Sequence, residues 1–176
     1  MRIAFSGTHR TGKSTLLAAV ASRLPGYAIV DEPYHLLEDE GYEQGQEPSL
    51  EDFEAQLARS IEVLQEGQRD ILFDRCPADV LAYLMTHEEA ATFDRDEWMD
   101  RARDALETLD LIVFVPIEQP DRIAVAADED RAWRAAVDAA LEELLIDNAL
   151  ELDVAVLRVD GAVASRVAEV LARVPG

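Results

Sequence analysis

Residues 7–14 read Gly-Thr-His-Arg-Thr-Gly-Lys-Ser, in which two glycines separated by four residues are followed by a lysine and a hydroxyl residue. This is the pattern G-x-x-x-x-G-K-[ST], which needs a buried strand before it and a helix after it. Residues 2–6 form an apolar run, and leucine and valine recur at helical spacing over 14–24. The segment therefore predicts a strand, a glycine-rich loop and a helix whose N-terminus faces the loop.

Lys13 is the only lysine in the sequence, and the other fifteen basic side chains are arginines. A compact ammonium can reach between two phosphates, whereas a broad planar guanidinium does this poorly. Glycines at the two ends of the loop allow backbone geometry that turns successive N–H groups toward an anion. We therefore expect the loop to bind ATP through its phosphates, with Ser14 placing its hydroxyl on the accompanying Mg²⁺. The residues expected to contact the nucleotide are Gly7, Arg10, Thr11, Gly12, Lys13, Ser14 and Thr15.

The charge balance is strongly acidic, with 37 Asp and Glu residues against 16 Lys and Arg residues and a net charge of −21. This charge repels nucleic acid and anionic membranes, so neither is an expected partner. It would also repel a nucleotide, so the binding site must be a local basic island. A single cysteine, Cys76, excludes an internal disulfide, and no apolar run is long enough for a signal peptide or a membrane span. We expect a cytoplasmic protein, for which the sequence leaves a homodimer open.

Strand-like runs alternate with helical patterns along the 176 residues. This alternation predicts an α/β domain spanning 1–176, with a five-stranded parallel sheet and helices on both faces. A strand that is almost entirely apolar, as 110–116 is, is typical of a sheet covered on both sides. The least regular stretches are 33–48 and 117–130, and we expect both to be mobile, the second as part of a lid-like segment over about 117–134. The expected strands are 2–6, 27–31, 70–74, 110–116 and 154–159.

Charged residues stand where two of these strands end. The second strand ends in Asp31-Glu32-Pro33, and the third ends in Asp74-Arg75-Cys76-Pro77. Such residues are often only the solvated start of a loop. However, ligands bind beyond the carboxyl ends of parallel strands, and both strands are expected to flank the glycine-rich loop. We therefore expect these charges to lie near the nucleotide.

Taken in chain order, the loop at 7–14, Glu32-Pro33, Asp74-Arg75-Cys76 and Arg131-x-x-Arg134 resemble small-molecule kinases of the deoxynucleoside kinase and ribosylnicotinamide kinase type. The resemblance extends over most of the chain. The same features are similar to small bacterial phosphate-loop ATPase-like proteins of unassigned activity. The resemblance implies the three-layer fold of phosphate-loop nucleoside triphosphatases.

The resemblance also implies roles for individual residues. Glu32 would take the proton from the acceptor hydroxyl, with Asp31 as its substitute. Asp74 would hold Mg²⁺ directly or through water, and Arg75 would bind the acceptor or the transferring phosphoryl group. Cys76 stands where the family has serine, so a serine hydroxyl contact is not carried over.

In those kinases a lid bearing arginines closes over the phosphates. Arg131 and Arg134, three residues apart on one helix, would present both guanidinium groups to the phosphoryl oxygens, joined by Arg122. The alternative is that these arginines form solvated ion pairs with neighbouring acidic residues.

Two functions follow from these features. The first is an ATP-dependent phosphotransferase that moves the terminal phosphoryl group of ATP to a hydroxyl of a nucleoside or a similar small metabolite. The second is an ATP- or GTP-hydrolysing regulatory or switch protein without a small-molecule acceptor. Glu32-Pro33 favours the kinase, because a switch does not need a base beside an acceptor hydroxyl. Tyr34, Phe53 and Gln56 are candidates for an acceptor pocket, but the acceptor itself is not identified by the sequence.

Overall fold

The computed structural model describes residues 1–45, 48–118 and 130–175. In these residues five strands form one sheet in the order β2-β3-β1-β4-β5, and every neighbouring pair is parallel. This confirms the predicted α/β class and the five-stranded parallel sheet. The strands are β1 (Arg2–Ser6), β2 (Ala28–Val30), β3 (Ile71–Asp74), β4 (Leu111–Phe114) and β5 (Ala155–Arg158).

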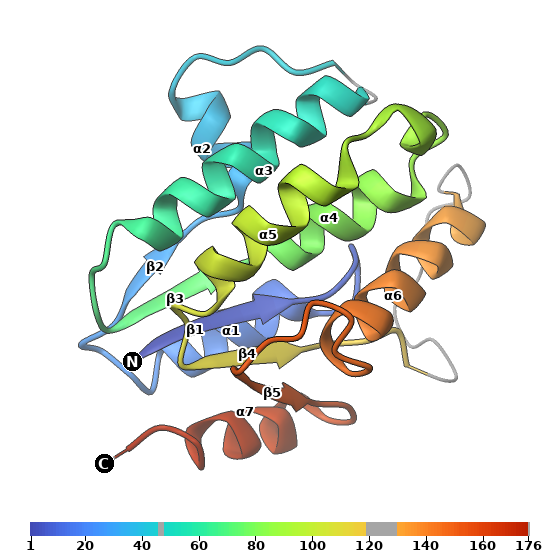
Figure 1. Cartoon of the computed structure of the whole chain (residues 1–176). Helices are drawn as coiled ribbons and strands as arrows, with labels where there is room; N and C mark the ends of the chain where they lie inside the picture. Colours follow the sequence, from blue (N-terminus) through green and yellow to red (C-terminus); the bar gives the residue numbers. More distant parts are fainter. Residues whose placement is uncertain (46–47, 119–129, 176) are drawn as a thin grey trace.

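Helices cover both faces of the sheet (Figure 1). One side carries α3 (Leu50–Gln65), α4 (Pro77–Thr86), α5 (Arg95–Leu106) and α6 (Arg131–Leu145), and the other side carries α1 (Lys13–Ala21) and α7 (Val163–Leu171). Successive side chains of a strand point to opposite faces. In β1, Ile3 and Phe5 pack with α1 and α7, whereas Ala4 packs with the opposite group of helices. The central strands are therefore buried on both faces and mainly apolar, with polar residues only at their ends.

A helix that the sequence did not indicate, α2 (Pro33–Asp39), begins directly after β2. The expectation of an irregular stretch from 33 to 48 is wrong for these seven residues. Pro33 occupies the first turn, where the missing N–H costs the helix nothing, and Leu37 is buried. The helix fixes the position of Glu32, its N-cap residue.

The expected lid-like segment falls mostly outside the described residues, because 119–129 are not among them. Its last residues form the start of α6. A short 3₁₀ helix, Ala90–Thr92, connects α4 to α5. Among the described helices, none has the length and apolar character needed to cross a membrane.

Candidate nucleotide-binding site

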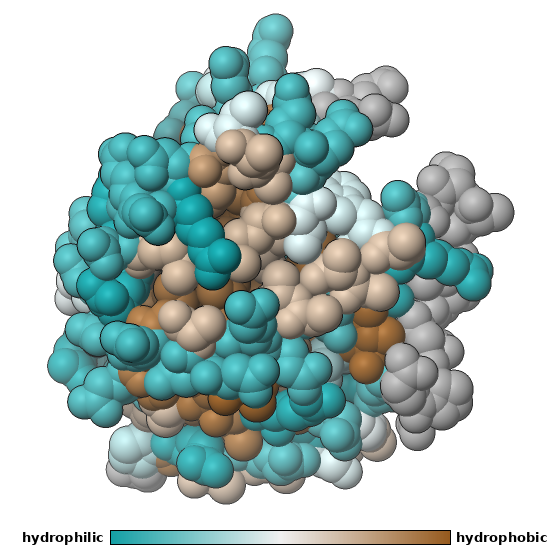
Figure 2. All heavy atoms as spheres, turned by 45° about the vertical axis from the view of Figure 1, so that its right-hand side comes forward, coloured by the Kyte–Doolittle hydropathy of each residue, from teal (hydrophilic) through white to brown (hydrophobic). Residues whose placement is uncertain are grey.

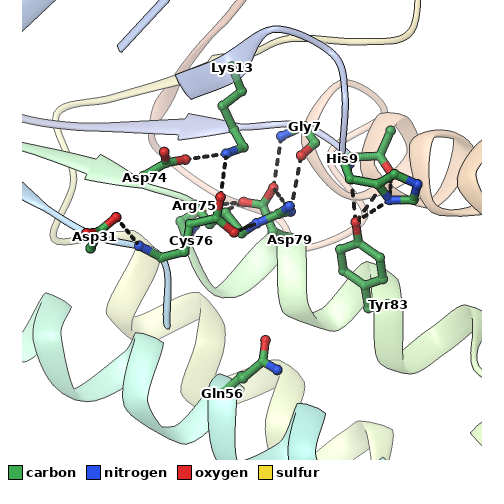
Figure 3. Close-up of polar contacts among 12 residues, drawn as sticks. Gly7, His9, Lys13, Asp31, Gln56, Asp74, Arg75, Cys76, Asp79 and Tyr83 are labelled. Atoms are coloured by element: carbon green, nitrogen blue, oxygen red, sulfur yellow. Dashed lines mark hydrogen bonds and ion pairs between the residues drawn. The ribbon is translucent and has the colours of Figure 1, made fainter. Parts of the chain in front are cut away.

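The glycine-rich loop leaves the carboxyl end of β1 and enters α1 at Lys13 (Figure 3). Gly12 has φ 85° and caps α1. A Cβ on Gly7 would lie 2.4 Å from the carbonyl oxygen of Val115, so the loop passes β4 too closely for any side chain at this position. The loop lines a cavity of about 330 Å³ together with Glu32 and Arg75. Figure 2, which brings the carboxyl ends of the strands forward, shows hydrophilic residues around a central area of mixed and hydrophobic residues.

Lys13 is buried between two carboxylates that come from the ends of two different strands. Its side chain is 4 % exposed, and its ammonium forms a short ion pair with Asp74, the last residue of β3. The Nζ atom also lies 3.5 Å from Oε1 of Glu32, two residues beyond β2. Because β3 lies between β2 and β1, the ends of three adjacent strands bring these groups together.

Arg75 connects Glu32 to the loop. Its Nε donates to Glu32 Oε2 at 2.7 Å, and its Nη1 donates to the carbonyl oxygen of Gly7 at 3.2 Å. The residue adopts φ 74°, an unusual conformation for a side chain of this size. Burial raises the pKa of the Glu32 carboxyl, but the charges of Arg75 and Lys13 outweigh burial and hold this pKa below its ordinary value. Glu32 is therefore ionised at neutral pH.

Asp79 is a fully buried carboxylate that the sequence analysis did not select. It accepts hydrogen bonds from the backbone N–H of Gly7 at 2.8 Å and of Cys76 at 2.9 Å, and it lies 3.7 Å from Nη1 of Arg75. Burial raises the pKa of its carboxyl despite these partners. The signal for it is a capping pattern, because Asp79 is the third residue of α4 after the N-cap Cys76.

The two arginines expected in the lid lie differently from one another. Arg131 is exposed at the start of α6, whereas Arg134 is buried and donates to the carbonyl oxygens of His9 and Arg10, both at 3.0 Å. Arg134 thus binds the backbone of two residues that line the cavity, but it is not itself among the lining residues. Arg122 lies outside the described residues.

Another arginine contacts the loop from α7, and the sequence analysis did not select it. Arg166 is 7 % exposed, and its Nη1 donates to the carbonyl oxygen of Thr11 at 3.3 Å. Its guanidinium also pairs with Glu118, which accepts the N–H of Gly161 at 2.6 Å.

The residues expected in an acceptor pocket are not among those that line the cavity. Phe53 is buried and stacks on Tyr83 with ring centroids 5.4 Å apart. Gln56 points from α3 toward the charged residues, but its amide donates to Gln44 at 2.8 Å (Figure 3). The hydroxyl of Tyr34 donates to an exposed carboxylate of its own helix.

Ser14 and Asp74 offer a hydroxyl and a carboxylate, which are the hard oxygen ligands that Mg²⁺ accepts alongside phosphate oxygens and water. Ser14 is exposed and lines the cavity, and Asp74 ends the neighbouring strand. In the described part of the chain, no group of three or more His, Cys, Asp or Glu residues could hold a metal ion. These two residues fit an ion that is held mainly by the nucleotide and water.

The fold and the loop define a phosphate-loop protein of the α/β class. The profile of the family described as AAA domain matches residues 2–166, and the chain belongs to this family. The resemblance to phosphate-loop kinases is confirmed at the level of the fold by solved structures.

Three of these structures illustrate the likeness. Deoxyadenosine kinase from M. mycoides with bound dATP is 18% identical, with 98% of each chain covered and a TM-score of 0.69. Thymidylate kinase from Ehrlichia chaffeensis is 15% identical, with 97% of this chain and 98% of that chain covered and a TM-score of 0.66. Thymidylate kinase from Candida albicans is 16% identical, with 97% and 88% covered and a TM-score of 0.62. No curated protein matches the sequence.

Proposed function

We propose that the chain is a phosphotransferase that moves the terminal phosphoryl group of ATP to a hydroxyl group of a nucleoside-like small molecule. One observation carries this proposal: Glu32 Oε1 lies 3.5 Å from Lys13 Nζ, the ammonium that would bind the terminal phosphates. A carboxylate at this distance from the phosphate site can contact an acceptor hydroxyl. In a nucleotide-hydrolysing switch the same carboxylate would act on water instead, so dependence on an acceptor separates the two functions.

In the proposed complex, backbone N–H groups of the loop and the ammonium of Lys13 bind the phosphates of ATP. Gly7 and Gly12 give the loop its shape, and Arg10, Thr11 and Thr15 lie along the phosphates. Ser14 and Asp74 would hold Mg²⁺, which neutralises charge on the phosphate oxygens when it is bound. Lys13 exchanges its contact with Asp74 for the nucleotide.

The chemical step needs positioning more than covalent assistance. The acceptor oxygen forms a bond to the γ-phosphorus, the bond from this phosphorus to the β–γ bridging oxygen breaks, and ADP leaves with the electron pair. Glu32 accepts the proton of the acceptor hydroxyl. Arg75 holds Glu32 and contacts the acceptor or the transferring group, and Arg131 is available from α6 to stabilise its charge.

The charges around Glu32 favour an acceptor without a phosphate group. Arg75 is already bound to Glu32 and lies 3.7 Å from Asp79. Arg59, the arginine of α3, pairs with three glutamates. These two arginines therefore neutralise the protein's own carboxylates, and a phosphate group on the acceptor would meet the remaining negative charge. A neutral nucleoside meets no such penalty.

The test is release of ADP by the purified protein with Mg²⁺ and ATP, offered nucleosides, nucleoside monophosphates and pyridine ribosides in turn. We expect release that depends on a nucleoside or a riboside, with little from monophosphates. ADP release that is independent of any acceptor would contradict the proposal and favour the nucleotide-hydrolysing alternative.

A pair of matched variants tests the base. Glu32→Gln should lower kcat by about 100-fold or more, while the Kd for ATP stays within about threefold. Asp31→Asn removes the adjacent, exposed carboxylate and should retain activity. If Asp31→Asn lowers kcat as much as Glu32→Gln does, the role assigned to Glu32 is wrong.

A further inference from the structure

Three consecutive carbonyl groups of the glycine-rich loop are bound by arginines from two different helices. Arg134 of α6 donates to the carbonyl oxygens of His9 and Arg10, both at 3.0 Å. Arg166 of α7 donates to the carbonyl oxygen of Thr11 at 3.3 Å. Both arginines are nearly inaccessible to solvent, at 4 % and 7 % exposure of the residue. We refer to Arg134 and Arg166 as the carbonyl brace.

A peptide unit contains the C=O of one residue and the N–H of the next, and it is planar. A donor that fixes the carbonyl of His9 therefore also fixes the N–H of Arg10. In the same way, the carbonyls of Arg10 and Thr11 set the N–H groups of Thr11 and Gly12. The brace thus acts on the N–H groups that would face a phosphate chain on the inner side of the loop.

The loop needs this external support because part of its backbone is unfavourable. Arg10 has φ 56°, in the left-handed region that side chains other than glycine, asparagine and aspartate rarely adopt. Gly12, two residues further on, also has a positive φ, of 85°. A hydrogen bond from a charged donor is shorter and stronger than a neutral one, and it polarises the peptide unit that accepts it. The same contact therefore holds the strained backbone and strengthens its N–H as a donor.

We propose that Arg134 and Arg166 are positioning residues that preorganise the N–H groups of residues 10–12 for a phosphate chain from the carbonyl side of the loop. This inference rests on the proposed function only in that the loop binds phosphates. It gives Arg134 a role that does not require its guanidinium to touch the nucleotide. The two arginines act on different peptide units, so their effects should be separable.

The test compares Arg134→Gln, Arg134→Lys and Arg166→Gln with the wild-type protein, in binding of a nonhydrolysable ATP analogue and of tripolyphosphate. Tripolyphosphate probes the loop without a base or a sugar. Arg134→Gln should raise both Kd values by about 10-fold, because it loses two charge-assisted hydrogen bonds. Arg166→Gln should raise them by about threefold, since only one longer bond to the loop is lost. Arg134→Lys should recover part of the affinity, because an ammonium can bind one of the two carbonyls.

Arg158→Gln is the charge-matched control. Arg158 lies on β5 at 43 % side-chain exposure and pairs with Glu142 of α6, so this variant removes the same charge near the same helix. We expect its Kd values to stay within about twofold of the wild type. A second readout, hydrogen exchange of the amides of Arg10, Thr11 and Gly12, should accelerate in the brace variants and not in the control.

The proposed role of the carbonyl brace is overturned if the folded variants Arg134→Gln and Arg166→Gln bind both ligands with Kd values within twofold of the wild type. This holds even if the melting temperatures of the variants fall. It is supported if affinity falls in the order given and the three amides exchange faster. Failure of the proposed kinase is a separate result, because it would leave tripolyphosphate binding intact and abolish only acceptor-dependent ADP release. A wild-type protein that binds neither ligand would overturn both.

Discussion

The anchoring of the loop by Asp79 gives a prediction whose size follows from the structure. The change is Asp79→Ala, which leaves the buried N–H groups of Gly7 and Cys76 without their acceptor. It also removes a carboxylate 3.7 Å from the guanidinium of Arg75. A hydrogen bond to a charged group contributes about 1.5–3 kcal/mol, so the two bonds together contribute about 3–6 kcal/mol.

An opposing contribution reduces this figure. Burial raises the pKa of the Asp79 carboxyl, although Arg75 and the backbone N–H groups lower it. The protein therefore bears a cost for keeping this charge inside, and alanine relieves that cost. We expect Asp79→Ala to reduce the free energy of unfolding by about 3 kcal/mol at pH 7. Asp79→Asn keeps one acceptor oxygen and should lose about half as much.

Urea denaturation of the wild type and both variants measures these differences, provided that the m values agree. Asp94→Ala is the control, because Asp94 also accepts an N–H at the start of a helix but is exposed. It should lose about 1 kcal/mol. If Asp79→Ala costs no more than Asp94→Ala, the anchoring of the loop by Asp79 is refuted.

The raised pKa of Asp79 also sets the sign of a pH dependence. A folded-state pKa above the unfolded value means that the folded protein holds this proton more tightly. The resulting stability is complete below the unfolded pKa and is lost as pH rises through the folded pKa. The stability advantage of the wild type over Asp79→Asn should therefore shrink as pH rises through this window, and a difference that grows would contradict the assignment.

Two further substitutions test the geometry of the site. Gly7→Ala places a Cβ 2.4 Å from the Val115 carbonyl oxygen and should reduce the free energy of unfolding by about 2 kcal/mol or more. In the control Gly26→Ala, the new Cβ meets no atom within 4 Å, and the free energy of unfolding should change by less than about 0.5 kcal/mol. Equal effects of the two variants in urea denaturation would contradict the close approach of the loop to Val115. Arg75→Gln removes a charge that lowers the pKa of Glu32. The acid limb of the pH profile of kcat/KM for phosphoryl transfer should therefore move to higher pH. An acid limb that stays in place would exclude Glu32 as the titrating base.

The sheet and the meeting of its charged ends could be predicted from sequence. Apolar runs located all five strands: β1, β3 and β4 are buried on both faces, and the partly exposed edge strands β2 and β5 are also mainly apolar. The ends of β2 and β3 then had to lie beside the loop once the strands were parallel neighbours. That reasoning placed Glu32, Asp74 and Arg75 near Lys13, as the structure does.

The remaining features depend on information that a local pattern lacks. α2 is only seven residues long and begins with proline, so its periodicity is too short to be distinguished from a loop. The capping pattern marks Asp79 only as a helix cap, and its bond to Gly7, like the bond from Arg166 to Thr11, involves a backbone group that has no sequence signature. The spacing of Arg131 and Arg134 was consistent with one shared side, but the rotation of α6 about its axis decides which of them is buried.

The surroundings of the loop explain how such an acidic chain can present a phosphate site at all. The carboxylates of Asp74, Glu32 and Asp79 would by themselves repel a nucleotide. Lys13 and Arg75 lie among them within ion-pair distance, so these charges are largely neutralised locally. The net charge of −21 is therefore carried mainly by exposed side chains, which solvent and salt screen. Attraction for a phosphate chain must then come from oriented N–H groups and from the ammonium that a nucleotide frees, so the geometry of the loop matters more than its net charge.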